Sequence, residues 1–229
     1  MLFKRHRQLY LRRTVLRCSM ENIKRLSGVA MLAMAALSFT NLFGLPIAGL
    51  TVLIGVACFF IDKGKTPFAQ SGFDCKGIGK AFSDKTIWLW MALPLLMDGI
   101  AVILSKLVLP EFIAHVASRT AVLVSFDRVA LMLIQLIVFA VGEEIAWRAF
   151  FQNQAQRMMP APLAVLVTSV LFGIGHIADG NAVVIVYDVF FVGVNSCLYG
   201  IVFYKTKNAW MSAIAHFAAN LFSVMILQF

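Results

Sequence analysis

Residues 128–157, RVALMLIQLIVFAVGEEIAWRAFFQNQAQR, form an apolar run long enough to cross a bilayer, and three charged side chains interrupt its interior. A membrane-spanning helix needs about 20 mainly apolar residues to cross roughly 30 Å of hydrocarbon. Ionisable side chains inside such a run cost free energy unless they are paired or face a wet cavity. Glu143, Glu144 and Arg148 are therefore the first candidates for a functional site.

The rest of the chain shares the apolar composition of this run. Of its 229 residues, 61% are apolar and 14% are charged, with a mean hydropathy of +0.85, whereas soluble domains carry roughly 25% charged residues. This composition excludes a water-soluble enzyme and an intrinsically disordered protein. We predict an all-α fold, a polytopic integral membrane helical bundle with about seven (six to eight) transmembrane helices, at 27–43, 45–61, 86–109, 128–157, 161–178, 182–204 and 209–228.

The net charge of +9 is concentrated at the N-terminus, where residues 1–25 hold eight basic side chains and one acidic one. Most of the other Lys and Arg residues fall in segments such as 62–85 and 205–208. Because cytoplasmic loops of membrane proteins are enriched in Lys and Arg, we expect a cytoplasmic N-terminus in the inner (cytoplasmic) cell membrane. We interpret 1–25 as a basic cytoplasmic arm that contacts anionic lipid headgroups, expect no nucleic-acid partner, and assign 26–229 to a single membrane domain.

Three expected spans carry polar residues at a spacing of four. Glu144 and Arg148 share one helical face and can neutralise each other, which leaves Glu143 without a partner in its own helix. The fifth span contains Phe172 and His176, and the seventh contains His216 and Asn220. Sites in helical bundles are built from side chains on facing helices, so we expect these three polar groups to converge.

The depth of these residues supports the convergence. Glu143 and His176 are equally far along the sequence from the turn near 158–162. At 1.5 Å per residue, both lie about 20 to 25 Å from that turn and so at the same depth. His216 is closer to its own basic segment, about 15 Å by the same rise, so we expect the cavity to open toward the cytoplasm.

The motifs Glu-Glu-x-x-x-Arg, Phe-x-x-x-His and His-x-x-x-Asn, in this order on separate spans, resemble those of the CPBP family of intramembrane proteases, also called the Abi or CAAX-protease family. The resemblance covers about residues 125–225, which we take as a protease-like core. It implies an intramembrane endopeptidase that acts on a membrane-associated peptide or protein. In eukaryotic and archaeal relatives the substrate is a prenylated CAAX peptide, and some bacterial members act in bacteriocin self-immunity or peptide processing.

The resemblance also implies roles for single residues. Glu143 and His176 would activate the attacking water, while His216 and Asn220 would form the oxyanion hole. The two structural members of the first motif, Glu144 and Arg148, would hold it in shape, and Phe172 would pack in the wall of the site. This division matches the chemistry of amide hydrolysis, which needs a base, a donor to the oxyanion and an acid for the leaving amine.

The same residues permit a metal-dependent alternative. Glu143, His176 and His216 make up a donor set that catalytic zinc accepts, and their spacing does not decide between the two mechanisms. The motif His-Glu-x-x-His is absent from the sequence. We therefore expect no cofactor, with zinc as the alternative.

Two other kinds of function use intramembrane Glu and His residues. A proton- or ion-coupled carrier employs them as relays, but carriers are often built from internal repeats, and we see none in this sequence. The other alternative is a catalytically silent immunity or scaffold protein of the same fold.

Several further polar residues have structural interpretations. Asp188 and Asn195, seven apart on one face, either border the same cavity or bond to a neighbouring helix. Asp98 is expected to have a partner elsewhere. His115 in the expected outer segment 110–127, like His6 in the arm, is expected to be solvated.

Overall fold

The computed structural model describes residues 25–64, 66–122 and 124–228. Most of the expected basic arm, including His6, lies outside these residues. Within the described ranges the chain folds into helices and connections, with no strand. The predicted all-α class is confirmed.

The helices follow one another with short connections. After the first helix, Arg25–Phe43, which ends in the 3₁₀ turn η1 (Thr40–Phe43), the elements are α2 (Leu50–Lys63), α3 (Phe68–Ser71), η2 (Cys75–Gly77), α4 (Ile78–Phe82), α5 (Lys85–Val108), α6 (Glu111–Ala121), α7 (Val129–Glu144), η3 (Ile145–Gln152), α8 (Asn153–Ala155), α9 (Ala161–Ile174), α10 (Ala182–Thr206) and α11 (Ala209–Gln228).

Among the described residues, five helices are long and apolar enough to cross a membrane: Arg25–Phe43, Lys85–Val108, Val129–Ala155, Ala182–Thr206 and Ala209–Leu227. The expected spans at 45–61 and 161–178 correspond to α2 and α9, which have 14 residues each. At 1.5 Å per residue such a helix measures about 21 Å, less than the hydrocarbon thickness. These two helices are therefore shorter than the spans expected there, and each is exposed on one side, for example at Leu53 (67%) and Leu166 (53%).

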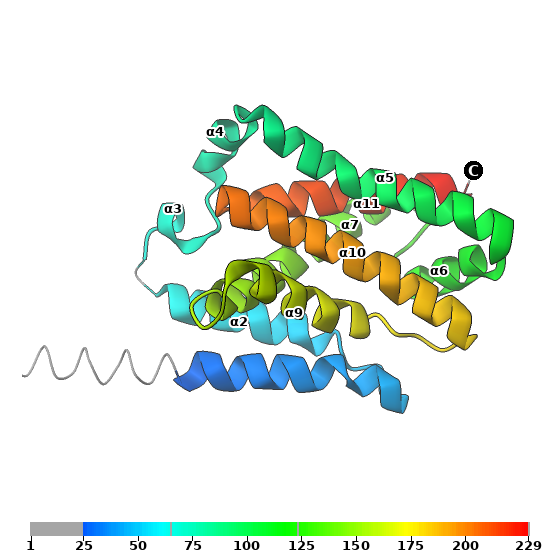
Figure 1. The fold of residues 1–229 in the computed structure, drawn as a ribbon, viewed down its shortest axis with the longest axis horizontal. Coiled ribbons are helices and arrows are strands. Elements are labelled where there is room, and N and C mark those ends of the chain that lie inside the picture. Colours follow the sequence, from blue (N-terminus) through cyan, green and yellow to red (C-terminus); the bar gives the residue numbers. More distant parts are fainter. Residues whose placement is uncertain (1–24, 65, 123, 229) are drawn as a thin grey trace, which may run out of the picture.

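The helices pack around α10 (Figure 1), which lies between α9 on one side and α5 on the other. Behind it, α11 packs against α5, α7 and α10, and the first helix and α2 form one edge of the bundle, with α2 against η3. Large apolar side chains are exposed on the outer faces of the long helices, for example Leu32 (73%) and Leu107 (75%). A soluble monomer rarely exposes so many, so these faces suit contact with lipid.

The segment 110–127, expected to be an outer loop, contains the helix α6, which packs against α10 and α5. Phe112, on this helix, is buried in a cluster with Ala101, Val184 and Phe191. In the sequence the apolar residues of α6 are interspersed with polar ones, so they did not indicate a helix. As a result, α6 closes the bundle at the end opposite α4 (Figure 1).

Side-chain caps set the starts of α5 and α10. The Asp84 carboxylate accepts a hydrogen bond from the Thr86 amide at 2.9 Å, and Asn181 accepts one from the Val183 amide at 2.9 Å. These bonds satisfy backbone donors that have no partner inside the helix. The backbone hydrogen bond from Thr86 lowers the pKa of the Asp84 carboxyl below its ordinary value.

Candidate active site

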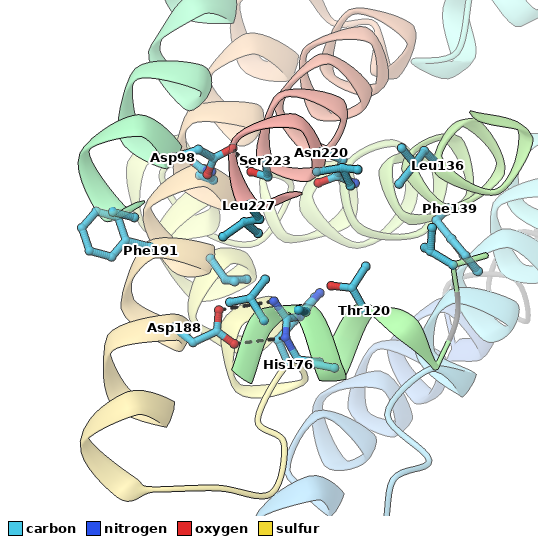
Figure 2. Close-up of a pocket in the computed structure, with 18 of the residues that line it drawn as sticks. Asp98, Thr120, Leu136, Phe139, His176, Asp188, Phe191, Asn220, Ser223 and Leu227 are labelled. Atoms are coloured by element: carbon cyan, nitrogen blue, oxygen red, sulfur yellow. Dashed lines mark hydrogen bonds and ion pairs between the residues drawn. The ribbon is translucent and has the colours of Figure 1, made fainter. Parts of the chain in front are cut away.

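Polar residues from each of the three motifs meet around one cavity of about 560 Å³ (Figure 2). Its wall includes Glu143 from α7, His216 and Asn220 from α11, and His176 and Phe172 from the C-terminal end of α9. The structure thus brings together the four residues for which the resemblance implies catalytic roles. Phe172 lines the cavity, where the sequence analysis placed it.

Glu144 and Arg148 lie beneath this wall and form an ion pair with no solvent exposure. Nε of Arg148 is 3.1 Å from Oε2 of Glu144. The guanidinium also donates to the carbonyl and hydroxyl oxygens of Ser196 on α10, at 3.1 and 2.8 Å. A buried charge needs both a counter-charge and hydrogen bonds, and this network supplies both. Ser196 was not predicted, because nothing in the sequence indicates which residue of α10 faces Arg148.

His216 lies between the two glutamates. Its Nδ1 is 3.1 Å from Oε1 of Glu144, and its Nε2 is 3.7 Å from Oε2 of Glu143. Its ring stacks on Tyr199 with centroids 4.5 Å apart. The Glu144 carboxylate is paired with Arg148, so it can only accept a hydrogen bond from His216. The proton of this hydrogen bond therefore lies on Nδ1. The Nε2 atom then donates only when the ring is an imidazolium.

His176 has a different partner. Its Nδ1 is 2.8 Å from the carbonyl oxygen of Phe172. A carbonyl only accepts, so Nδ1 carries the proton and the neutral ring keeps a lone pair on Nε2. The two histidines therefore present opposite hydrogen-bonding characters, one with a free acceptor and one with a potential donor.

The position of His176 differs from the expectation. It was expected to continue the helix of the fifth span, but α9 ends at Ile174 and His176 lies in the following turn. Asn41 holds this turn from the end of the first helix, because its amide donates to the carbonyl oxygens of Gly175 and Ile177 at 3.0 and 2.9 Å. These hydrogen bonds fix the position of the backbone on both sides of His176.

The helix that carries the two glutamates changes its winding directly after them. The segment η3, Ile145–Gln152, is π-helical, and all eight of its residues are buried. Wider π turns are rare and often occur at functional sites. Here the segment bears Arg148 and also Gln152, which donates to the carbonyl oxygen of Gly200 at 2.9 Å. The sequence pattern predicted a single α-helix and missed this change.

A second charged cluster borders the cavity. Asp188 on α10 lies 3.1 Å from Nε of Arg119 and 3.4 Å from Nε2 of His115, both on α6. Asp188 and His176 both line the cavity (Figure 2). The expectation that His115 is solvated is wrong, since its side chain is 8% exposed. It was wrong because the expected loop is a helix packed on α10.

A third group of polar residues comes from three helices. Asp98 on α5 accepts hydrogen bonds from Asn195 on α10 at 2.6 Å and from Ser223 on α11 at 2.8 Å. All three line the cavity. Both interpretations of Asn195 therefore apply, since it borders the cavity and bonds to a neighbouring helix.

The cavity lies toward the end of the bundle that carries α6. Its wall includes residues 116–121 of α6 and extends along α11 from His216 to Leu227, whereas the basic segments 62–85 and 205–208 lie at the other end. This differs from the expected opening toward the basic segments. That expectation used only the depth of His216, but Asn220 and Ser223 continue the wall toward the far end of α11.

The candidate metal ligands are not gathered into one group. In the part of the chain that the structure describes, no group of three His, Cys, Asp or Glu side chains is gathered closely enough to hold an ion. Glu143 and His216 lie together, and His176 keeps the lone pair of Nε2, but the three side chains do not form a close group. A catalytic zinc site requires three protein ligands, which these side chains do not provide in this arrangement.

These features define a helical integral membrane protein with a polar site inside the bundle. Residues 125–222 match the family model described as type II CAAX prenyl endopeptidase Rce1-like. The match spans the three motifs and confirms the resemblance to the CAAX-protease family; it supports a protease of the CAAX type. No curated protein and no solved structure shows detectable similarity to the chain.

Proposed function

We propose that the protein is an intramembrane endopeptidase that hydrolyses a peptide bond of a membrane-associated peptide or protein with water activated by Glu143 and His176. The observation that supports this most directly is that two histidines of opposite hydrogen-bonding character line one cavity together with Glu143. Hydrolysis needs an acceptor for the proton of water and a donor for the oxyanion, and the two rings offer one of each.

Water activation falls to the acceptors. With Nδ1 bonded to Phe172, His176 has Nε2 available to accept a hydrogen bond from water. The Glu143 side chain is 20% exposed, so its carboxylate reaches the cavity. In this mechanism the Glu143 carboxylate takes the proton of the water while His176 orients the water. The Glu143 carboxyl then returns the proton to the leaving amine.

Oxyanion stabilisation falls to the donors. In the imidazolium form, His216 donates from Nε2 while Glu144 accepts from Nδ1. Asn220 lies one turn further along α11 and also lines the cavity, so its amide can supply a second donor. Preorganised donors of this kind lower the barrier most effectively where water is excluded.

The network also balances its charges. Two carboxylates, Glu143 and Glu144, face one guanidinium and one imidazolium, which sum to zero. A neutral set is the least costly way to keep ionised groups inside a bundle. Glu144 and Arg148 act here as positioning residues, since neither lines the cavity.

The cavity is large enough for part of a peptide substrate. The cavity volume of about 560 Å³ suits a short extended peptide segment, and sites of this size hold ligands rather than single waters.

We further propose that the N-terminus is cytoplasmic in the cell membrane and that the basic arm contacts anionic headgroups.

Peptide cleavage by the purified protein in lipid nanodiscs tests the proposal, with a library of quenched fluorescent peptides that carry a hydrophobic anchor. Glu143→Gln and His176→Ala should lower the rate by about 10²- to 10⁴-fold with little change in the melting temperature. Glu111→Gln, on the exposed start of α6, is the matched control. Wild-type rates in both site variants would disprove the assignment.

A comparison of cells expressing wild type and Glu143→Gln would identify the natural substrate as a membrane peptide that is no longer processed. Solute or proton counterflow in liposomes that is abolished by the same substitutions, without any peptide cleavage, would instead favour the carrier.

A further inference from the structure

Asp98 is a carboxylate in the middle of the long apolar helix α5 that the proposed mechanism does not use. It lies 13 residues after the start of the helix at Lys85, about 20 Å along its axis, and its side chain lines the cavity (Figure 2). Ionisable groups at such a depth are costly and generally mark a functional position. The question is what balances its charge.

The other carboxylates around the site have cationic partners. Glu144 is paired with Arg148, Asp188 with Arg119, and Glu143 lies beside His216. Asp98 differs: within the described ranges no Lys, Arg or His nitrogen lies within 4.0 Å of it, and its two hydrogen-bond donors, Asn195 and Ser223, are neutral. When it is ionised, Asp98 therefore has no counter-charge within this distance among the described residues.

A second observation concerns Asn195, the residue of α10 that donates to Asp98. Asn195 is 8% exposed, and while its amide nitrogen donates to Asp98, its carbonyl oxygen Oδ1 is buried without a hydrogen-bond partner. Buried acceptors are rarely left unpaired. Asp98, Asn195 and the hydroxyl of Ser223 together offer oxygen acceptors from three helices and one negative charge.

We propose that Asp98, Asn195 and Ser223 form a subsite for an ammonium group of the substrate, as carried by a lysine side chain. An ammonium has three donors and no acceptor, which complements this set of oxygens, and its charge balances that of Asp98. The apolar stem of such a side chain would lie against apolar wall residues such as Val102 and Val224. The inference rests on the proposed peptidase function, to which it adds a preference for a cationic residue.

Binding of a small probe tests the subsite without any catalysis. Hexylammonium should raise the melting temperature of the wild-type protein in nanodiscs more than hexanol does, because hexanol has the same alkyl chain but carries no charge. Asp98→Asn, which keeps the shape of the side chain, should abolish the excess shift, and Ser223→Ala should reduce it. Glu143→Gln, a carboxylate of the same cavity, should retain it.

Equal shifts with hexylammonium and hexanol in the wild type would overturn the proposal, and so would an excess shift that persists in Asp98→Asn. A stabilisation by sodium over choline chloride that is lost in Asp98→Asn, with no response to hexylammonium, would assign the group to a metal cation instead. If Asp98→Asn does not fold, the comparison of wild type with Ser223→Ala and Glu143→Gln still decides.

Cleavage provides the functional readout. Peptides that differ only by lysine or norleucine, scanned across positions on either side of the scissile bond, should show one position where lysine raises kcat/KM by about tenfold, because a hydrogen bond to a charged group contributes that much. Asp98→Asn should remove this preference while still cleaving the norleucine peptide. A preference for lysine at no position, in an enzyme that cleaves the library, would refute the subsite alone; absence of cleavage of all peptides would count against the proposed function.

Discussion

Oε1 of Glu144 lies 3.1 Å from Nδ1 of His216, so the second glutamate of the first motif contacts a residue of the third motif directly. The other oxygen of the same carboxylate is bound by Arg148. Glu144 therefore does more than hold its own helix in shape. It joins the scaffold to the ring that we propose as an oxyanion donor, and it fixes which nitrogen of that ring faces the cavity.

Glu144→Gln should destabilise the protein strongly. Arg148 has no solvent exposure, and the loss of its counter-charge leaves a buried cation, which typically costs about 3 to 5 kcal/mol. Urea or thermal unfolding in nanodiscs would measure the effect. The double variant Glu144→Gln with Arg148→Met should recover much of the stability and none of the activity, since His216 still lacks its carboxylate. A fully active double variant would show that the contact with His216 has no role.

Asn41→Leu should lower kcat by roughly 10- to 100-fold with little change in KM, because a catalytic group displaced by about 1 Å loses activity on this scale. The two hydrogen bonds of Asn41 hold the backbone around His176, and the side chain is not part of the cavity wall. Thr40→Ala is the neighbouring control, since its hydroxyl bonds only within its own helix. Equal losses in both variants would indicate a general effect on the first helix.

Gly55→Ala should separate α2 from η3. A Cβ at this position would lie 2.5 Å from the Cβ and 2.7 Å from the Cα of Ala146, and backbone does not yield readily. Overpacking of this kind costs about 1 to 3 kcal/mol, and because η3 directly follows the two glutamates, activity should fall as well. Gly28→Ala is the control, with nothing within 4 Å of the added atom. The melting temperatures of the two variants give the comparison.

Exhaustive chelation should leave peptide cleavage unchanged. The described residues offer no three-ligand group, and the roles proposed for Glu143 and His176 need only water. Dialysis against 1,10-phenanthroline followed by rate measurement and elemental analysis provides the check. Activity that disappears and returns with zinc alone would restore the metal-dependent alternative.

The cavity should lie on the outer side of the membrane if the N-terminus is cytoplasmic. Cys75, which is exposed in the basic segment, and a cysteine introduced at the exposed Ser118 of α6 report on the two ends of the bundle. In sealed right-side-out vesicles, an impermeant maleimide should label position 118 and leave Cys75 unlabelled, with the other cysteines replaced by serine. The opposite labelling would reverse the orientation.

The sequence predicted the parts of this protein that depend on local pattern. Apolar runs predicted the helices, and the spacing of four predicted the ion pair of Glu144 with Arg148, which lies within one helical turn. The rarity of charges inside such runs indicated which side chains line the cavity. These predictions succeed because burial in lipid constrains each residue almost independently of its distant neighbours.

Other features arise from contacts between residues far apart in the sequence. How the helices pack decides three of these features. They are the hydrogen bonds from Asn41 to the turn of His176, the pairing of His115 and Arg119 with Asp188, and the π-helical winding of η3. A short helix such as α6 looks like a loop until another helix buries its apolar face.

The sequence alone therefore determined that the chain is a helical membrane protein with polar groups on three of its helices. Only the tertiary structure decided what each group does, because the proton positions on His176 and His216 follow from a carbonyl and a carboxylate, Phe172 and Glu144, that tertiary packing orients toward them. Spacing along a helix says which side chains share a face, whereas hydrogen-bonding character depends on the partner that packing supplies.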